Sequence, residues 1–535
     1  MTGVAGKQWS ERWATPLVAA LTLLVVLLCF GPSIDTSLVS DGYSLVVNPG
    51  VRAEPLAAHF TRPYNYSDYY RPLTTLSLDL TNRLLGDAPT PHHLIQLLLH
   101  WLACLALYGL ARRLLSSRLW GAAAALLFAV HPLVMHTTLW VGDRSDALAL
   151  PLMLGALYAY LRWSESESEG WRRRSWLAVA ALVQLAALLA KEAVLVAPAL
   201  AGLLVWWRAR TAERPFKRNL LIVLAVSLAV VVLYYGWRLV FGLGGDLPLT
   251  LRGLPQRLVY YLALLPGVAE LKTVSRPLAL LPALVAALVC LGPLVWGTVR
   301  SARRTARGRL AAALTSPPGL ALLWIIINLA PVSFAFNLWY YYFIVPGFVL
   351  GLAWLLRELW RRRKIVGGIA FALLLGYYLV AGLSGALHWR RCAEAGDALT
   401  ADLTAQRQTI IDSGSLTLMT VPWFFSREAV PLPTPVYNYA WGMPYRLEHE
   451  LGSFVEFRCA TYTVVGDLDD WGYDGRRTGD TLLQTSADGA LARAHNNAYT
   501  PPGVDFTPGE VRLEASGGSP VFALVGDRFE LLYAP

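Results

Sequence analysis

Long apolar runs separated by short polar loops fill the first 385 residues and predict a membrane-embedded bundle of helices. Runs of about 18 or more apolar residues are long enough to cross a bilayer, and the pattern yields about eleven spans. The expected spans cover residues 14–31, 92–111, 119–138, 147–163, 176–190, 193–207, 219–241, 278–299, 319–336, 342–356 and 366–385. From His388 the apolar runs shorten to strand length, which predicts a separate soluble unit.

The composition agrees with a multi-pass membrane protein. Hydrophobic residues make up 55% of the chain and charged residues only 15%, and the mean hydropathy is +0.44. A soluble core does not need so much apolar surface. The first apolar run follows Lys7 and Arg12 as a signal peptide would, but no clear small-residue cleavage site follows it, so we expect a retained first span.

Every second loop is basic, which predicts the orientation of the chain. Of the 46 Lys and Arg residues, 24 lie in six loops that together hold 64 residues. These loops cover residues 1–14, 112–118, 162–175, 208–218, 300–309 and 357–364. They should face the cytoplasm of a multi-pass protein in the cell's inner (plasma) membrane, with the N-terminus inside. The formal charge of +10 therefore reports topology, and no nucleic-acid partner is expected.

An odd number of spans places the C-terminal part outside the cytoplasm. We expect a transmembrane domain over residues 1–386, with its first outer loop at 32–91, and an extracytoplasmic domain over 387–535. Strand-length runs such as "LTLMTV" predict a soluble α+β or mainly β fold for the outer domain. Cys392 and Cys459 both fall in it, and spacing alone does not decide whether they form a disulfide.

Charged residues gather on the side of the membrane predicted to face outward. Asp41 follows the first span, and the stretch "HPLVMHTTLWVGDRSDAL" at residues 131–148 lies between two apolar runs. The other members of this group are Arg71, His93, His131, His136, Asp143, Arg144, Asp146, Lys191 and Glu192. Because ionisable groups at membrane depth are costly unless they are paired or face water, a one-sided group of them predicts a shared cavity.

Four segments resemble the GT-C membrane glycosyltransferases. They read "YYRPLTTLSLDL", "HHLIQLLLH", "FAVHPLVMHTTLWVGDRSDAL" and "LLAKEAVLVAPAL", in the order and near the spacing of that superfamily. The chain is most similar to the branch of the transmembrane and tetratricopeptide-repeat O-mannosyltransferases and their bacterial relatives, although the repeats are absent. The resemblance implies a GT-C fold over roughly residues 15–385.

It also implies an enzyme that moves one sugar, mannose-like, from a polyprenyl-phosphate carrier to a protein, glycan or lipid acceptor on the outer face. Asp41 matches the position of the acid that acts as general base in such enzymes. The carrier phosphate calls for cations, and Arg71, Arg144 and Lys191 are the candidates, Arg144 foremost. The supporting residues are His93, His131, Asp146 and Glu192.

The chain departs from the family pattern in three places. Ser40 replaces the first of two adjacent acids, His136 stands where relatives have Glu, and Tyr340 and Tyr341 stand in place of a Glu-Arg pair. With one acid of the pair gone, a divalent metal is not favoured, and we expect no required cofactor and no metal ligands. Two alternatives stay open: a catalytically silent assembly protein that kept the fold, and a transporter or flippase of lipid-linked sugar. The outer domain is expected to shape acceptor access without chemistry of its own.

Overall fold

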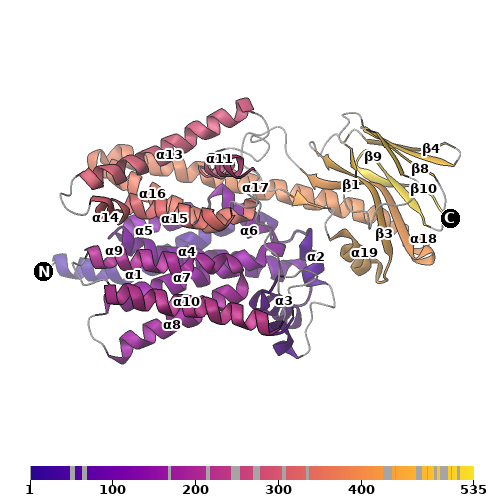
Figure 1. Ribbon diagram of the computed structural model, residues 1–535. Coiled ribbons are helices and arrows are strands. Elements are labelled where there is room, and N and C mark those ends of the chain that lie inside the picture. The colour runs from indigo at the N-terminus through magenta and orange to yellow at the C-terminus, as the bar shows by residue number, and fades with distance from the viewer. Residues whose placement is uncertain are drawn as a thin grey trace.

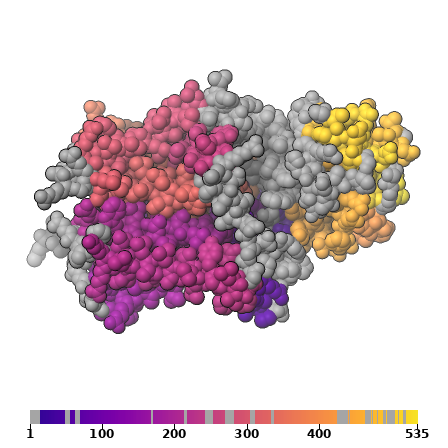
Figure 2. Space-filling view, in the orientation of Figure 1, coloured from indigo at the N-terminus to yellow at the C-terminus, as the bar shows by residue number. Residues whose placement is uncertain are grey.

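A helical bundle forms most of the computed structural model, and a smaller unit of strands and short helices lies at one end of it (Figure 1). Figure 2 shows the same division on the surface, where the C-terminal residues, drawn in yellow, gather at one end. The structure describes residues 2–47, 55–62, 69–166, 170–211, 217–241, 253–268, 277–303, 309–332, 337–425, 437–439, 442–465, 471, 473–478, 480–486, 491–493, 504–507, 509–514 and 519–535.

Eight helical segments of the described chain are long and apolar enough to cross a membrane, or nine if a bent pair is counted as one span. The helices in the eight are α1 (Thr2–Phe30), α4 (Pro89–Leu114), α8 (Trp171–Ala190), α9 (Ala197–Thr211), α10 (Lys217–Val240), α13 (Pro277–Arg303), α16 (Tyr341–Arg362) and α17 (Lys364–Ala405). The prediction of a multi-pass helical membrane protein is therefore confirmed, with fewer clear spans than the eleven expected.

The three other expected spans are helical but depart from a simple apolar helix. Residues 119–138 form the bent pair, in which α5 (Arg118–Ala129) is followed at a 54° bend by η4 (Pro132–Val134) and α6 (Met135–Leu139). Pro132 lacks an N–H and holds His131 in an extended conformation, so the helix breaks there.

The remaining two are α7 (Arg144–Glu165), which opens with charged residues, and α15 (Pro317–Val332), which has only 16 residues. Most of α7 is buried among its neighbours α4, α8 and α9. A helix surrounded by protein does not need a fully apolar surface, which explains why hydropathy alone marks α7 weakly.

Loops predicted to face one side of the membrane lie at one end of the bundle. Arg357 donates a hydrogen bond to the backbone oxygen of Leu115, and Arg113 pairs with Glu165 at 2.5 Å. These contacts join three of the basic loops. The N-terminus lies at the same end and the strand-containing unit at the other (Figure 1).

Short helices at the other end cover the bundle and carry most of the residues of interest. They are η1 (Gly31–Ser33), α2 (Asp41–Val46), η3 (Leu56–Phe60), α3 (Pro72–Leu85), η5 (Val141–Asp143), η6 (Glu192–Val196) and η7 (Leu338–Tyr340). Two further helices, α11 (Leu254–Leu264) and α14 (Arg309–Leu314), pack beside α13.

The C-terminal unit is an α+β structure, as one of the two expectations had it. α17 is continuous across residues 386 and 387, and α18 (Arg407–Ser413) links it to the first strand. The larger sheet has the order β10-β9-β1-β3-β6, with β2 paired to β1. The smaller sheet, β4-β5-β8-β7, is antiparallel. The strands are β1 (Ser415–Phe425), β2 (Tyr437–Asn438), β3 (Glu456–Val465), β4 (Tyr473–Thr478), β5 (Thr481–Ser486), β6 (Ala492–Arg493), β7 (Val504–Thr507), β8 (Glu510–Glu514), β9 (Val521–Val525) and β10 (Arg528–Tyr533).

β1 lies at the centre of the larger sheet. It runs parallel to both β3 and β9, with Leu418 opposite Cys459 on one side and Phe522 on the other. Central parallel strands are buried on both faces, which accounts for the continuous burial of residues 416–421. Cys392 and Cys459 are both buried free thiols in this structure. α19 (Met443–Leu451) packs between this unit and α2, close to the bundle.

Candidate functional site

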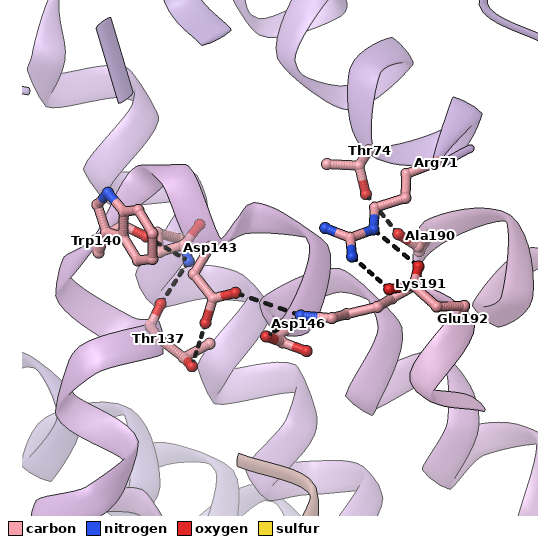
Figure 3. Close-up of polar contacts among 10 residues, drawn as sticks. Arg71, Thr74, Thr137, Trp140, Asp143, Asp146, Ala190, Lys191 and Glu192 are labelled. Atoms are coloured by element: carbon pink, nitrogen blue, oxygen red, sulfur yellow. Dashed lines mark hydrogen bonds and ion pairs between the residues drawn. The ribbon is translucent and has the colours of Figure 1, made fainter. Parts of the chain in front are cut away.

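Three helix breaks bring five charged residues together at the covered end of the bundle (Figure 3). Arg71 precedes α3, whose first residue is a proline of fixed φ that favours a helix start there. Asp143 ends η5 and Asp146 lies in the first turn of α7. Lys191 is a single extended residue between α8 and η6, and Glu192 follows it. We call these five residues the charge cluster.

Arg71 and Glu192 form the more accessible part of the charge cluster. The guanidinium binds the carboxylate through two hydrogen bonds, with Arg71 Nε 2.9 Å from Oε2. The Tyr69 ring lies 4.5 Å from the guanidinium carbon. The two charged side chains are 12% and 18% exposed, so a ligand can reach this pair without unfolding the site.

Lys191, Asp146 and Asp143 form the closed part. Lys191 Nζ binds Asp146 and lies 3.8 Å from Asp143 Oδ1, and none of these side chains is more than 4% exposed. Burial raises the pKa of Asp143 well above its usual range, and the neighbouring Asp146 carboxylate adds to this effect. Burial alone would lower the pKa of Lys191, but Asp146 and Asp143 outweigh it, so the net shift is upward and the ammonium form is favoured.

Two hydroxyl-bearing residues border the closed part. Thr137 Oγ1 donates a hydrogen bond to Asp143 Oδ2 at 2.5 Å, as Figure 3 shows. The centre of the Tyr340 ring lies 5.6 Å from Lys191 Nζ. An aromatic ring therefore contacts the cation at a position where relatives were expected to have a charged residue. Tyr341, the other replaced position, directs its hydroxyl to the backbone oxygens of Tyr260 and Tyr261.

Arg144 is fully buried beside the charge cluster. Its Nε donates to Gln96 Oε1 and its Nη2 to the backbone oxygen of His92, both at 2.8 Å. Its Nη1 lies 3.5 Å from Ser77 Oγ. These bonds join the start of α7 to α3 and α4. Arg144 was the foremost cation candidate from the sequence, and in the structure its guanidinium binds buried protein groups. Asp146 binds Lys191 instead of Arg144.

The two candidate histidines contribute to packing. His131 caps η4, because its Nδ1 accepts from the backbone N–H of Leu133 at 3.2 Å, and its ring packs edge-on against Tyr378. His93 is buried in the first turns of α4. The sequence reasoning placed Asp143 in the same group of charged residues but not among the site residues. Its spacing of three from Asp146 at a helix start is the signal that could have identified it.

Asp41 is the first residue of α2, and its side chain lies outside the described residues. The backbone around it is tied to the rest of the site. Trp140 Nε1 donates to the backbone oxygen of Val39 at 3.3 Å, and Asn82 Nδ2 donates to that of Val46 at 2.8 Å. Trp140 is three residues from Asp143, so α2 packs directly on the segment that supplies one acid of the charge cluster.

A cavity of about 540 Å³ opens between α2, the outer part of α17 and α19. Its lining includes Tyr43, Asp87, Asp397, Arg446, His449 and Glu450. It thus lies where the segment between α1 and α4 meets the C-terminal unit. In the part of the chain that the structure describes, no group of three or more His, Cys, Asp or Glu side chains could hold a metal ion.

The comparisons with known proteins centre on the same segment. The family model for dolichyl-phosphate-mannose-protein mannosyltransferase matches residues 71–237, which include the whole charge cluster and Arg144. The match covers less than half of the chain, so it shows that residues 71–237 are similar to this family of glycosyltransferases. The resemblance drawn from the motifs is confirmed as a similarity over this segment.

Among curated proteins, the protein O-mannosyl-transferase TMTC1 of Homo sapiens is 35% identical over 156 residues, which are 27% of this chain and 18% of that protein. Tmtc2 of Drosophila melanogaster is 40% identical over 136 residues, 24% of this chain and 14% of that protein. The chain therefore matches less than one fifth of the length of these relatives.

Among solved structures, ArnT from Cupriavidus metallidurans bound to undecaprenyl phosphate is similar with a TM-score of 0.45 and 17% identity, over 85% of this chain and 86% of that one. The Archaeoglobus fulgidus oligosaccharyltransferase in complex with zinc and sulfate gives a TM-score of 0.48 and 14% identity, over 91% of this chain and 74% of that one.

Proposed function

We propose that this protein transfers a single mannose-like sugar from a polyprenyl-phosphate carrier to an acceptor on the outer face of the membrane. The observation that carries this proposal is the family match over residues 71–237, because that segment contains all five residues of the charge cluster. Both cations of the cluster sit at the covered end of the bundle, where a lipid-linked phosphate at the membrane surface could meet them.

In this proposal Asp41 takes the proton from the acceptor, and Arg71 makes the main contact with the carrier phosphate. Arg71 is preferred to Arg144 and Lys191 because its pair with Glu192, at 12% and 18% exposed, is more accessible than either of them. A phosphate can share the planar guanidinium with Glu192, whereas Arg144 would first have to release its bonds to Gln96 and His92. Lys191 lies in the closed part of the charge cluster, and its positive charge stabilises the negative charge that develops on the phosphate as it leaves.

Arg71→Lys should weaken the use of the donor although it keeps the charge, because lysine cannot reproduce a planar two-pronged contact. Loss of a charge-assisted hydrogen bond typically costs about 1.5–3 kcal/mol, so kcat/KM for the donor should fall about 10- to 150-fold. The measurement is transfer of labelled mannose from polyprenyl phosphate in membranes. Arg83→Lys is the matched control, since Arg83 lies near the end of α3, the helix that follows Arg71, and pairs with Asp79. Equal kcat/KM values in the two variants would contradict the assignment.

The proposed orientation has the N-terminus in the cytoplasm and the C-terminal unit outside, in the plasma membrane. In a cysteine-free background, Asp480→Cys should react with an impermeant maleimide in intact cells, because the residue is exposed on the C-terminal unit. Lys364→Cys, at an exposed site in a basic loop, should react only after permeabilisation. The opposite labelling pattern would reverse the orientation and end the proposal for outer-face chemistry.

We further propose that transfer needs no metal ion and that the acceptor, a protein, glycan or lipid, enters through the cavity between α2 and α19. Activity that survives chelation of divalent ions would support the first point. If membranes that contain the protein transfer no sugar under any condition, the result favours the alternative of a catalytically silent assembly protein. If they move lipid-linked sugar across the bilayer without transfer, the flippase alternative replaces the proposal.

A further inference from the structure

The C-terminal unit reaches across to α2, the short helix that begins at Asp41. Two residues of the 442–451 segment take part in this contact. Gly442, just before α19, meets the backbone of Ser40, and Arg446 stacks on Tyr43. Figure 1 shows α19 and α2 next to each other at the junction of the two parts of the molecule.

Gly442 lies so close to Ser40 that only glycine fits. A Cβ on Gly442 would lie 2.1 Å from the backbone oxygen of Ser40, well inside van der Waals contact. Gly442 also has a φ of +88°, which disfavours other residues. Ser40 itself has a φ of 52° although it is not a glycine, so the residue before Asp41 is held in a costly conformation by its surroundings.

Arg446 ties α2 to the long helix that crosses the membrane. Its guanidinium carbon lies 5.2 Å from the centre of the Tyr43 ring, and its Nη2 pairs with Asp397 on α17. The Arg446 side chain is only 6% exposed, whereas Asp397 is 45% exposed, so the contact lies at the wall of the cavity. A buried cation stacked on a ring and paired with an acid fixes the position of that ring.

On its other side α2 contacts η5, the segment that leads to the charge cluster, and Trp140 donates a hydrogen bond to Val39 just before α2. α2 is therefore held between the membrane part and α19. We propose that Gly442 and Arg446 are positioning residues, through which the C-terminal unit fixes α2 and so aligns Asp41 with the charge cluster. This inference rests on the proposed role of Asp41. It extends the function of the C-terminal unit from acceptor access to the rate of the chemical step.

Gly442→Ala tests the inference, with Gly452→Ala as its matched control. Both glycines flank α19 with positive φ, but a Cβ on Gly452 meets only the mobile end of Arg407, at 3.4 Å. Both variants thus carry similar backbone strain, and only Gly442→Ala pushes on α2. Because misplacing a reacting group by about 1 Å can cost about 100-fold in rate, kcat should fall about 10- to 100-fold in Gly442→Ala, with the KM values for donor and acceptor nearly unchanged.

A rise confined to the acceptor KM would overturn the inference in favour of acceptor access alone. Tyr43→Leu removes the ring under Arg446 and should lower kcat as well. An unchanged kcat in this variant would also count against the inference.

Hydrogen exchange supplies a readout that does not depend on activity. The amides of residues 41–46 should exchange faster in Gly442→Ala than in Gly452→Ala, because α2 has lost its support. Equal exchange overturns the inference, whatever the activities are. If exchange differs but Asp41→Asn is fully active, α19 does hold α2, but the proposed chemistry of Asp41 is wrong. The two failures are therefore distinguishable.

Discussion

Replacing Asp41 with Asn should lower the rate of sugar transfer about 10²- to 10⁴-fold, the usual effect of removing a general base. Asn has almost the same shape as Asp but cannot take a proton from the acceptor. The backbone of α2 is held by Trp140, Asn82 and Gly442, so the variant should stay folded. Transfer in membranes and retained carrier binding are the two measurements.

Asp35→Asn is the matched control for this experiment. Asp35 belongs to the same outer segment, but its side chain is 61% exposed and pairs with the exposed Arg390. Such surface pairs contribute little, so the control should be nearly fully active. Near-normal transfer by Asp41→Asn would move the role of base to Asp143, which lies in the charge cluster, or to a water molecule.

Replacing Lys191 with Met should destabilise the protein by about 3–5 kcal/mol, because it leaves the buried carboxylates of Asp143 and Asp146 without their cation. The loss should appear as a lower unfolding temperature in detergent, together with loss of transfer. Without the cation, the pKa of Asp143, which burial and the neighbouring Asp146 carboxylate already raise, lies still further above its unfolded value. The folded state then binds more protons, so the variant should regain stability as the pH falls.

The double variant Lys191→Met, Asp146→Asn separates the structural from the functional effect. It removes the cation and one buried charge together, and the pKa of Asp143, already raised by burial, allows that acid to become neutral. Stability should therefore largely return while transfer stays low. If transfer returns with stability, Lys191 acts only in folding. If Lys191→Met alone loses no stability, Lys191 and Asp146 do not form a buried ion pair in the folded protein.

Local patterns in the sequence were enough to predict the class of the fold. A run of apolar residues must lie in lipid or in a core wherever the rest of the chain goes, so hydropathy located the spans. The alternation of basic loops grouped those spans by their ends, and the contacts between Arg357 and Leu115 agree with that grouping. Hydropathy was weakest at α7, since burial among other helices lets it carry charges.

The sequence also identified the charged residues of the site, because such residues are rare beside spans, but not their partners. Arg71 binds Glu192 from 121 residues away, and Arg144 binds Gln96 from 48 residues away. Which ion pair is exposed and which cation is enclosed depends on how α3, α4, α7 and α8 pack. Residue type and spacing carry no record of that packing, so they ranked Arg144 first although its guanidinium is enclosed by protein.

The contact between the two parts of the chain was decided by tertiary structure alone. The stretch "YNYAWGMPYR", residues 437–446, contains no pattern that predicts the contact of Gly442 with Ser40 or the stacking of Arg446 on Tyr43. The sequence by itself determined that most of the chain forms membrane-spanning helices, that basic loops share one end of them, that a strand-containing unit follows, and which charged residues lie at the site. Tertiary structure decided which charged residues pair with one another and where α2 packs. Hydropathy and helix or strand propensity act over a few residues, whereas these contacts join segments far apart in the chain.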